Sequence, residues 1–283
     1  MSQPVLSWEA TIRWLREQSD LADLVMAGYY DDPLEAAAIR YWQSAEWRAV
    51  VARLPVGCVG YALDFGAGRG IASFALAKTG YRVLAVEADA SALVGANAIR
   101  ALARATNTSI EVMESSSPRL PVADDTFDLV FGLAVLHHLP DLESACREFY
   151  RVLKPGGTLI MIREHVISKA GDLARFQALH PLHRYYGGEH AYPLDRYVSA
   201  IVGAGFSVQE VMRPFGSAIN LHPYTDDQLR TEIAQRLGLA GGRLAGAFRV
   251  LLANRCVWWL VRRSLDIIDN RPGRLYSFVA RRP

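Results

Sequence analysis

The stretch Ala62-Leu63-Asp64-Phe65-Gly66-Ala67-Gly68-Arg69-Gly70 decides the fold of this chain. Its apolar first half predicts a buried strand that leads directly into three glycines. Glycine tolerates positive φ and carries no Cβ, so a strand-to-helix turn containing Gly66 and Gly68 brings the main chain close to a ligand. The spacing is G-x-G-x-G, whereas a dinucleotide site needs a further glycine where this chain has Ile71. The stretch therefore predicts a nucleotide-type pocket that disfavours a pyrophosphate.

The segments that follow repeat a strand and helix rhythm. Residues 81–86 predict a second buried strand that ends at Glu87, close to the ~20-residue offset at which an acidic side chain meets ribose hydroxyls. Another apolar strand covers 127–131, and the run Lys154-Pro155-Gly156-Gly157 turns into a strand over 158–163. Such alternation builds a parallel sheet with helices on both faces and ligands at the carboxyl ends of the strands.

Together these motifs resemble the class I methyltransferases that use S-adenosylmethionine, a group that includes the ubiquinone and menaquinone C-methyltransferases and many small-molecule O-methyltransferases. The resemblance covers about residues 60–212. It implies an α/β fold with a doubly wound, Rossmann-like sheet of seven strands, mostly parallel with the last strand antiparallel. It also implies S-adenosyl-L-methionine as the cofactor.

The resemblance carries cofactor contacts over to matching positions. Asp64, Gly66 and Gly68 would line the methionine end and Glu87 would bind the ribose. Relatives often place an aspartate near the adenine just before a Leu-Pro pair, where this chain has serines, so Ser116 is the expected hydrogen-bonding substitute. The full expected set is Asp64, Gly66, Ala67, Gly68, Gly70, Glu87, Ala88, Ser116 and Leu133.

Four regions follow from these expectations. Residues 1–56 form an N-terminal helical lid, in which Asp32 is the predicted N-cap of a helix over 33–54 and Tyr30 and Trp42 are candidates to face the cofactor. The other three are a core over 57–214 with a His- and Tyr-rich substrate rim at 165–192, a helical insertion at 215–272, and the last core strand at 273–283.

The insertion is rich in arginine. A helix over 248–263 would place Arg249, Arg255, Arg262 and Arg263 on one arc of about 140°. Two interpretations stay open: the helix packs on its own domain, or residues 243–265 contact a membrane surface or a lipid-linked, anionic substrate. No apolar run reaches the roughly 18 to 20 residues that a membrane span needs.

Composition excludes several function classes. The net charge of +2 and the lack of a recognition module argue against nucleic acid. Three widely spaced cysteines indicate neither a disulfide framework nor a thiolate site, and His180, His183 and His190 lack accompanying ligands, so no metal is expected. No secretory signal is apparent, which predicts a cytoplasmic enzyme. The oligomeric state stays open.

Methyl transfer needs a base only when the acceptor must lose a proton. His165, beside Glu164 at the end of a strand, and the pair Glu189 and His190, in a loop before a helix, are the candidates, whereas His137 and His138 are expected to pack or cap. The favoured activity is O-methylation of a small-molecule hydroxyl. The alternatives are C-methylation of a quinone-like or lipid-linked acceptor, and a degenerate, cofactor-binding scaffold; Ile71 disfavours a nicotinamide-dependent oxidoreductase.

Overall fold

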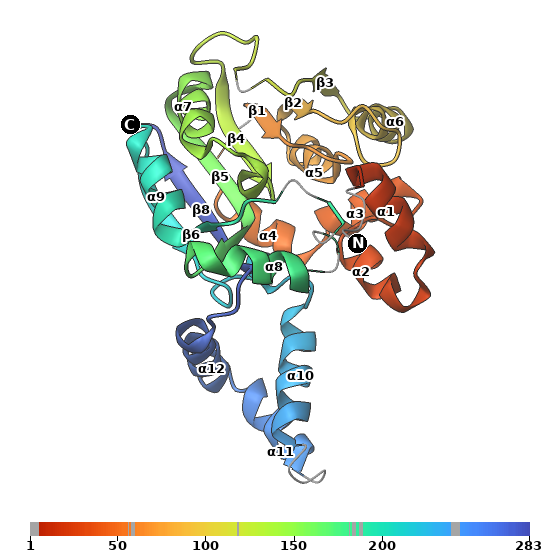
Figure 1. Cartoon of the computed structure of the whole chain (residues 1–283), viewed down its shortest axis with the longest axis vertical. Coiled ribbons are helices and arrows are strands. Elements are labelled where there is room, and N and C mark those ends of the chain that lie inside the picture. Colours follow the sequence, from red (N-terminus) through yellow and green to blue (C-terminus); the bar gives the residue numbers. More distant parts are fainter. Residues whose placement is uncertain are drawn as a thin grey trace.

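The computed structural model describes residues 6–55, 57, 60–117, 119–180, 182, 185–186, 189–238 and 244–283. Cys58 and His183 lie outside these residues. The described part of the chain folds around one sheet with helices on both faces, and a helical insertion projects from one end of the body (Figure 1).

The sheet has the strand order β3-β2-β1-β4-β5-β8-β7, and β8 runs antiparallel to both of its neighbours. The predicted seven-stranded, mostly parallel sheet is thereby confirmed, with a two-residue strand, β6, added beside β5. The strands are β1 (Tyr61–Phe65), β2 (Arg82–Glu87), β3 (Ile110–Glu114), β4 (Phe127–Leu133), β5 (Leu153–Ile167), β6 (Tyr192–Pro193), β7 (Ser207–Met212) and β8 (Arg274–Arg281).

Alternate residues of the central strands face two hydrophobic clusters. Leu63, Val130 and Leu159 face α7 and α9, whereas Ala62 and Leu129 face α3, α4 and α5. Central parallel strands are apolar on both faces because helices cover both, which explains the continuous apolar runs in the sequence. The covering helices are α3 (Leu34–Trp42), α4 (Ala45–Val51), α5 (Ile71–Lys78), α6 (Ala96–Thr106), α7 (Leu142–Val152) and α9 (Leu194–Gly203).

The N-terminal segment divides into two parts. Only α1 (Trp8–Glu17) and α2 (Ala22–Ala27) lie beyond the helical layer, while α3 and α4 bury Tyr41 and Trp47 in the core beside α5. The predicted cap at Asp32 is wrong: Pro33 is the N-cap residue of α3 and no side chain caps it. The Asp32 carboxylate instead accepts hydrogen bonds from Arg16 and Arg69.

The insertion consists of α10 (Asp226–Gly238), α11 (Leu244–Ala253) and α12 (Arg255–Ile268). The single helix predicted over 248–263 is wrong, because Asn254 ends α11 and caps α12 by accepting from two backbone N–H groups. Arg262 therefore faces inward to Asp226 and the carbonyl of Phe215, while Arg263 faces outward. Among the described residues, no helix is long and apolar enough to cross a membrane.

The remaining short elements follow the carboxyl ends of strands, except for the 3-10 turn η1 (Ser19–Leu21), which joins α1 to α2. They are the helix α8 (Leu173–Leu179) and the 3-10 turns η2 (Leu136–His138), η3 (Ala170–Asp172) and η4 (Ala218–Leu221). Of these, η2 follows β4 directly and so lies where ligands bind in open α/β sheets.

Candidate active site

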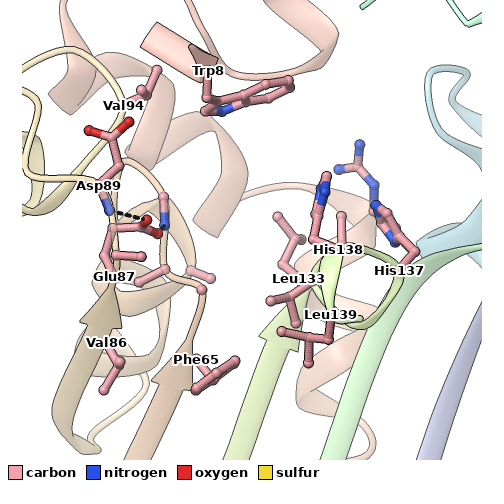
Figure 2. Close-up of a pocket in the computed structure, with 18 of the residues that line it drawn as sticks. Trp8, Phe65, Val86, Glu87, Asp89, Val94, Leu133, His137, His138 and Leu139 are labelled. Carbon is pink, nitrogen blue, oxygen red and sulfur yellow. Dashed lines mark hydrogen bonds between the residues drawn. The ribbon is translucent and has the colours of Figure 1, made fainter. Parts of the chain in front are cut away.

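A cavity of about 890 Å³ opens at the carboxyl ends of β1, β2, β4 and β5. Figure 2 shows Glu87 and Asp89 on one side of it, His137 and His138 on the other, and Trp8 over the space between. We call the first side the glycine wall (Asp64, Gly66, Gly68 and Glu87) and the second the histidine wall (His137, His138, His165 and His180). Residues of both walls line the same cavity.

The glycine turn has the predicted geometry. Gly66 and Gly68 have φ of 67° and 54°, and a Cβ on Gly66 would lie 2.4 Å from Cγ2 of Val135. A Cβ on Gly68 would meet nothing closer than the carbonyl of Val94 at 4.0 Å, so open space borders this backbone. The turn therefore exposes main-chain atoms to the cavity, as a cofactor-binding loop requires.

Asp64 lies at the base of this wall and is almost fully buried. Its Oδ2 accepts a hydrogen bond from the Ser73 hydroxyl at 2.5 Å, whereas Oδ1 has no hydrogen-bond partner among the described residues. Burial raises the pKa of Asp64 to about 7. A buried acceptor without a partner is costly, so a ligand donor that reaches Oδ1 would be strongly favoured.

Glu87 ends β2 beside the turn. Its two carboxylate oxygens accept from the backbone N–H groups of Gly68 at 2.7 Å and Asp89 at 2.9 Å (Figure 2). Burial raises the pKa of Glu87, although the backbone donors oppose this. Each oxygen has two lone pairs, so the fixed carboxylate retains acceptor capacity for ligand hydroxyls.

The other expected cofactor residues mostly lie on the cavity surface. Ala67, Ala88, Ser116 and Leu133 line it, as does Tyr30 from the N-terminal segment. Gly70 does not line the cavity: it has a φ of 84° at the start of α5 and packs against Ile99. Trp42 is also outside the lining and packs its ring under Lys78.

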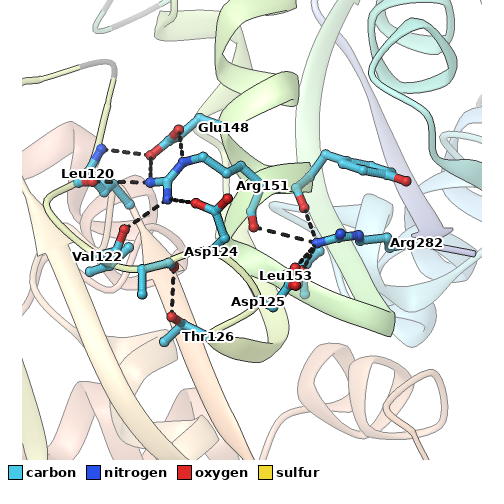
Figure 3. A network of polar contacts seen from close by, with 11 residues as sticks. Leu120, Val122, Asp124, Asp125, Thr126, Glu148, Arg151, Leu153 and Arg282 are labelled. Atoms are coloured by element: carbon cyan, nitrogen blue, oxygen red, sulfur yellow. Dashed lines mark hydrogen bonds and ion pairs between the residues drawn. The ribbon is translucent and has the colours of Figure 1, made fainter.

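An ion-pair network holds the loop that follows the serines. The Arg151 guanidinium on α7 binds Glu148, Asp124 and the carbonyls of Leu120 and Val122 (Figure 3). Glu148 also accepts from the backbone N–H of Leu120 at 2.8 Å and lines the cavity. The loop after β3 is thus attached to α7, which fixes the side of the cavity next to Ser116.

The centre of the histidine wall is a histidine and glutamate pair that sequence reasoning missed. His137 Nδ1 lies 2.6 Å from Glu164 Oε2, and both side chains are buried. The Glu164 carboxylate also accepts from the backbone N–H groups of Val135 and His137, each at 3.1 Å. Burial raises the pKa of Glu164 to about 8. Since Glu164 binds Nδ1, the imidazole orientation is fixed and Nε2 faces away from Glu164.

A second carboxyl group lies beyond this pair. Glu189 is buried outside the cavity lining, with its oxygens 3.7 Å from His137 Nε2 and 3.8 Å from His138 Nδ1. These three side chains bring potential metal-ligand atoms within 4.8 Å of one another, a grouping that differs from the His180, His183 and His190 set weighed in the sequence. Burial raises the pKa of Glu189 to about 8.

The two histidines that the sequence predicted as catalytic, His165 and His190, differ in position. His165 lines the cavity, and its Nδ1 lies 2.9 Å from the carbonyl of Gly273, which can only accept, so Nδ1 carries the proton. Its ring lies 4.6 Å from that of His137. His190 does not line the cavity; its backbone N–H donates to the carbonyl of His137 and its ring stacks on Tyr192.

Aromatic side chains from two distant segments cover the cavity. The Trp8 ring lies 6.1 Å from Tyr30, 5.1 Å from Tyr186 and 6.5 Å from His138, measured between ring centroids. The backbone of Leu6 donates to the carbonyl of Tyr185 at 2.9 Å. The N-terminal helices and the rim segment therefore form one cover over both walls.

Comparisons with known proteins find methyltransferases. Residues 63–161 match the family model described as a methyltransferase domain. The chain is 26% identical over 199 residues to the O-methyltransferase resE of Aspergillus sclerotiorum. This match covers 69% of this chain and 75% of the relative. It is 30% identical over 168 residues to the ubiquinone/menaquinone biosynthesis C-methyltransferase UbiE of an Enterobacter species, covering 58% and 61%.

A solved structure extends the likeness of the fold to almost the whole chain. The geranyl diphosphate C-methyltransferase of Streptomyces coelicolor, solved with Mg²⁺, geranyl diphosphate and S-adenosyl-L-homocysteine, superposes with a TM-score of 0.59 at 16% identity over 99% of this chain and 100% of that one. The chain is an S-adenosylmethionine-dependent methyltransferase with the class I fold.

Proposed function

We propose that this enzyme methylates a hydroxyl group of a small molecule. The observation that carries the proposal is the His137–Glu164 pair at 2.6 Å in the wall opposite the glycine turn. A hydroxyl acceptor must lose its proton as the new bond forms, and a histidine oriented by a carboxylate is the usual proton acceptor.

The residues of the glycine wall suit the cofactor. Asp64 Oδ1 is a buried acceptor, the backbone at Gly68 borders open space, and Glu87 is held by two backbone donors. We propose that Asp64 and Gly68 hold the methionine end and that Glu87 binds the ribose. S-adenosylmethionine supplies a methyl group on a sulfonium that already carries its leaving group.

The chain's own residues then position the acceptor and remove its proton. We assign His137 as the proton acceptor through Nε2, with Glu164 stabilising the imidazolium that forms. His165 stays the second candidate, because its Nδ1 proton is directed to Gly273 and it lines the same cavity. Glu189, beyond His137, and the backbone N–H of His190, which donates to the His137 carbonyl, help to position His137. Trp8, Tyr30 and Tyr186 exclude water from the reacting groups.

A second candidate is C-methylation of a quinone-like or lipid-linked acceptor, which the likeness to UbiE favours. Contact of residues 243–265 with a lipid surface would suit that acceptor. The experiment that separates the two is transfer of an isotope-labelled methyl group to a panel of phenols, sugars, macrolactones and quinols, followed by NMR of the product. A methoxy signal supports O-methylation, whereas a C-methyl signal contradicts it.

A further inference from the structure

The outer face of α11 and α12 is apolar and basic at the same time. Its large apolar side chains are between 50% and 76% exposed, and contiguous exposed apolar surface of this kind marks interaction sites. They are Val250, Leu251, Trp259, Leu260, Ile267 and Ile268. Figure 1 shows the insertion below the body, with α10 on one side, α12 on the other and α11 at the end farthest from the sheet.

The inner face of the same helices is already packed. Leu252 and Trp258 form a small core with Leu229 and Ala234, and the Trp258 indole donates to Asp226 at 2.8 Å. At 100° per residue, the exposed residues of α12 from Trp259 to Ser264 occupy an arc of about 140°, whose centre lies midway between Arg263 and Leu260. The outer stripe is therefore a second apolar surface that the fold itself does not cover.

The charges on this stripe are of one sign. Arg255 and Arg263 are exposed, and the Arg263 guanidinium lies 6.0 Å from the centre of the Trp259 ring. Residues 244–268 contain a single acidic side chain, Asp266, which is buried and accepts from the backbone of Phe215. A second copy of the chain packed face to face about a two-fold axis would bring arginines together without a carboxylate to pair them.

We propose that the outer face of α11 and α12 docks on an anionic lipid surface. Tryptophan with leucine and isoleucine inserts at the headgroup boundary, and arginines near the surface are attracted to anionic lipid. His222 and Leu275 line the cavity and flank the insertion on either side. Docking would thus bring a membrane-dissolved acceptor to the active site, a consequence that rests on the proposed function, whereas the docking itself does not.

The test is flotation of the full chain with vesicles of phosphatidylcholine alone or mixed with phosphatidylglycerol. We expect binding to the mixed vesicles only, weakened by salt, and a loss on the order of tenfold in both Trp259→Ser/Leu260→Ser and Arg255→Glu/Arg263→Glu. Val202→Ser on α9 and Arg104→Glu on α6 are matched controls, because both side chains are exposed elsewhere. All four variants should keep S-adenosylmethionine binding, which shows that they are folded.

Several results would overturn the proposal. The wild-type chain fails to float with the mixed vesicles, or both double variants bind as the wild type does. Alternatively, light scattering shows a dimer that Trp259→Ser/Leu260→Ser separates, in which case the face joins two copies. A chain that docks but transfers no methyl group would leave the docking intact and contradict the proposed function alone.

Discussion

The two walls of the cavity are assembled in different ways. In the glycine wall, main-chain contacts connect neighbouring segments: Gly66 and Ala67 donate to the carbonyl of Val86, and Gly68 donates to Glu87. In the histidine wall, side chains connect segments that are farther apart in the sequence. The Glu164 carboxylate accepts from the backbone N–H of Val135, and His165 binds the carbonyl of Gly273. The glycine wall therefore follows from a local backbone pattern, whereas the histidine wall depends on tertiary packing.

The largest expected effect comes from removing the proposed proton acceptor, His137. His137→Asn should lower methyl transfer about 10²- to 10⁴-fold, because the acceptor proton loses its base. Affinity for S-adenosylmethionine should stay within about twofold, since His137 lies in the other wall. Labelled methyl transfer and calorimetry measure the two quantities. His190→Asn is the control, because His190 does not line the cavity; equal activity of the two variants would contradict the role of His137.

A change in the glycine wall should instead weaken the binding of S-adenosylmethionine. Glu87→Gln removes one of two oxygens that accept from Gly68 and Asp89, so the Kd for S-adenosylmethionine should rise roughly tenfold or more. Calorimetric titration checks this value. Glu114→Gln, at the end of the neighbouring strand β3, is exposed and should bind as the wild type does. Unchanged affinity in Glu87→Gln would place the ribose elsewhere.

Glu189 should make stability fall with rising pH. Burial raises its pKa from 4.5 to about 8, so the folded state binds this proton more tightly than the unfolded chain does. The folded state therefore holds the extra proton between these values, and its stability is greatest below the unfolded pKa and declines as pH approaches 8, by up to about 1.4 kcal/mol per pH unit. Urea unfolding at several pH values should show a smaller decline in Glu189→Gln. Parallel curves for the two proteins would contradict the shift.

The smallest effect should come from the aromatic cover. Trp8→Ala removes a ring that contacts both the N-terminal segment and the rim, which is worth about 0.5 to 1.5 kcal/mol. We expect a fall of roughly threefold to tenfold in kcat/KM, measured with a saturating cofactor. Trp42→Ala is the comparison, because Trp42 does not line the cavity. A larger effect at Trp42 than at Trp8 would show that stability, and not coverage, explains the loss.

The backbone geometry of the glycine wall and its place on the cavity could be predicted because the information is local. Gly66, Gly68 and Glu87 are recognised by backbone needs and by spacing along a strand-turn-helix unit. The place of His137 and His138 directly after β4 was a usable signal for the other wall, since ligands gather at such strand ends. Their pairing with Glu164 was not visible, because it depends on how the end of β5 meets η2. The outward turn of Arg263 likewise follows from the helix break at Asn254, which periodicity alone did not indicate.

The most direct test of the two-wall account is a crystal structure of the chain with S-adenosylhomocysteine. We expect ribose hydroxyls on the Glu87 carboxylate, the amino acid end at Asp64 and Gly68, and the sulfur directed toward the space in front of His137. A ligand that places its purine at Asp64, or that leaves Glu87 without a contact, would contradict it.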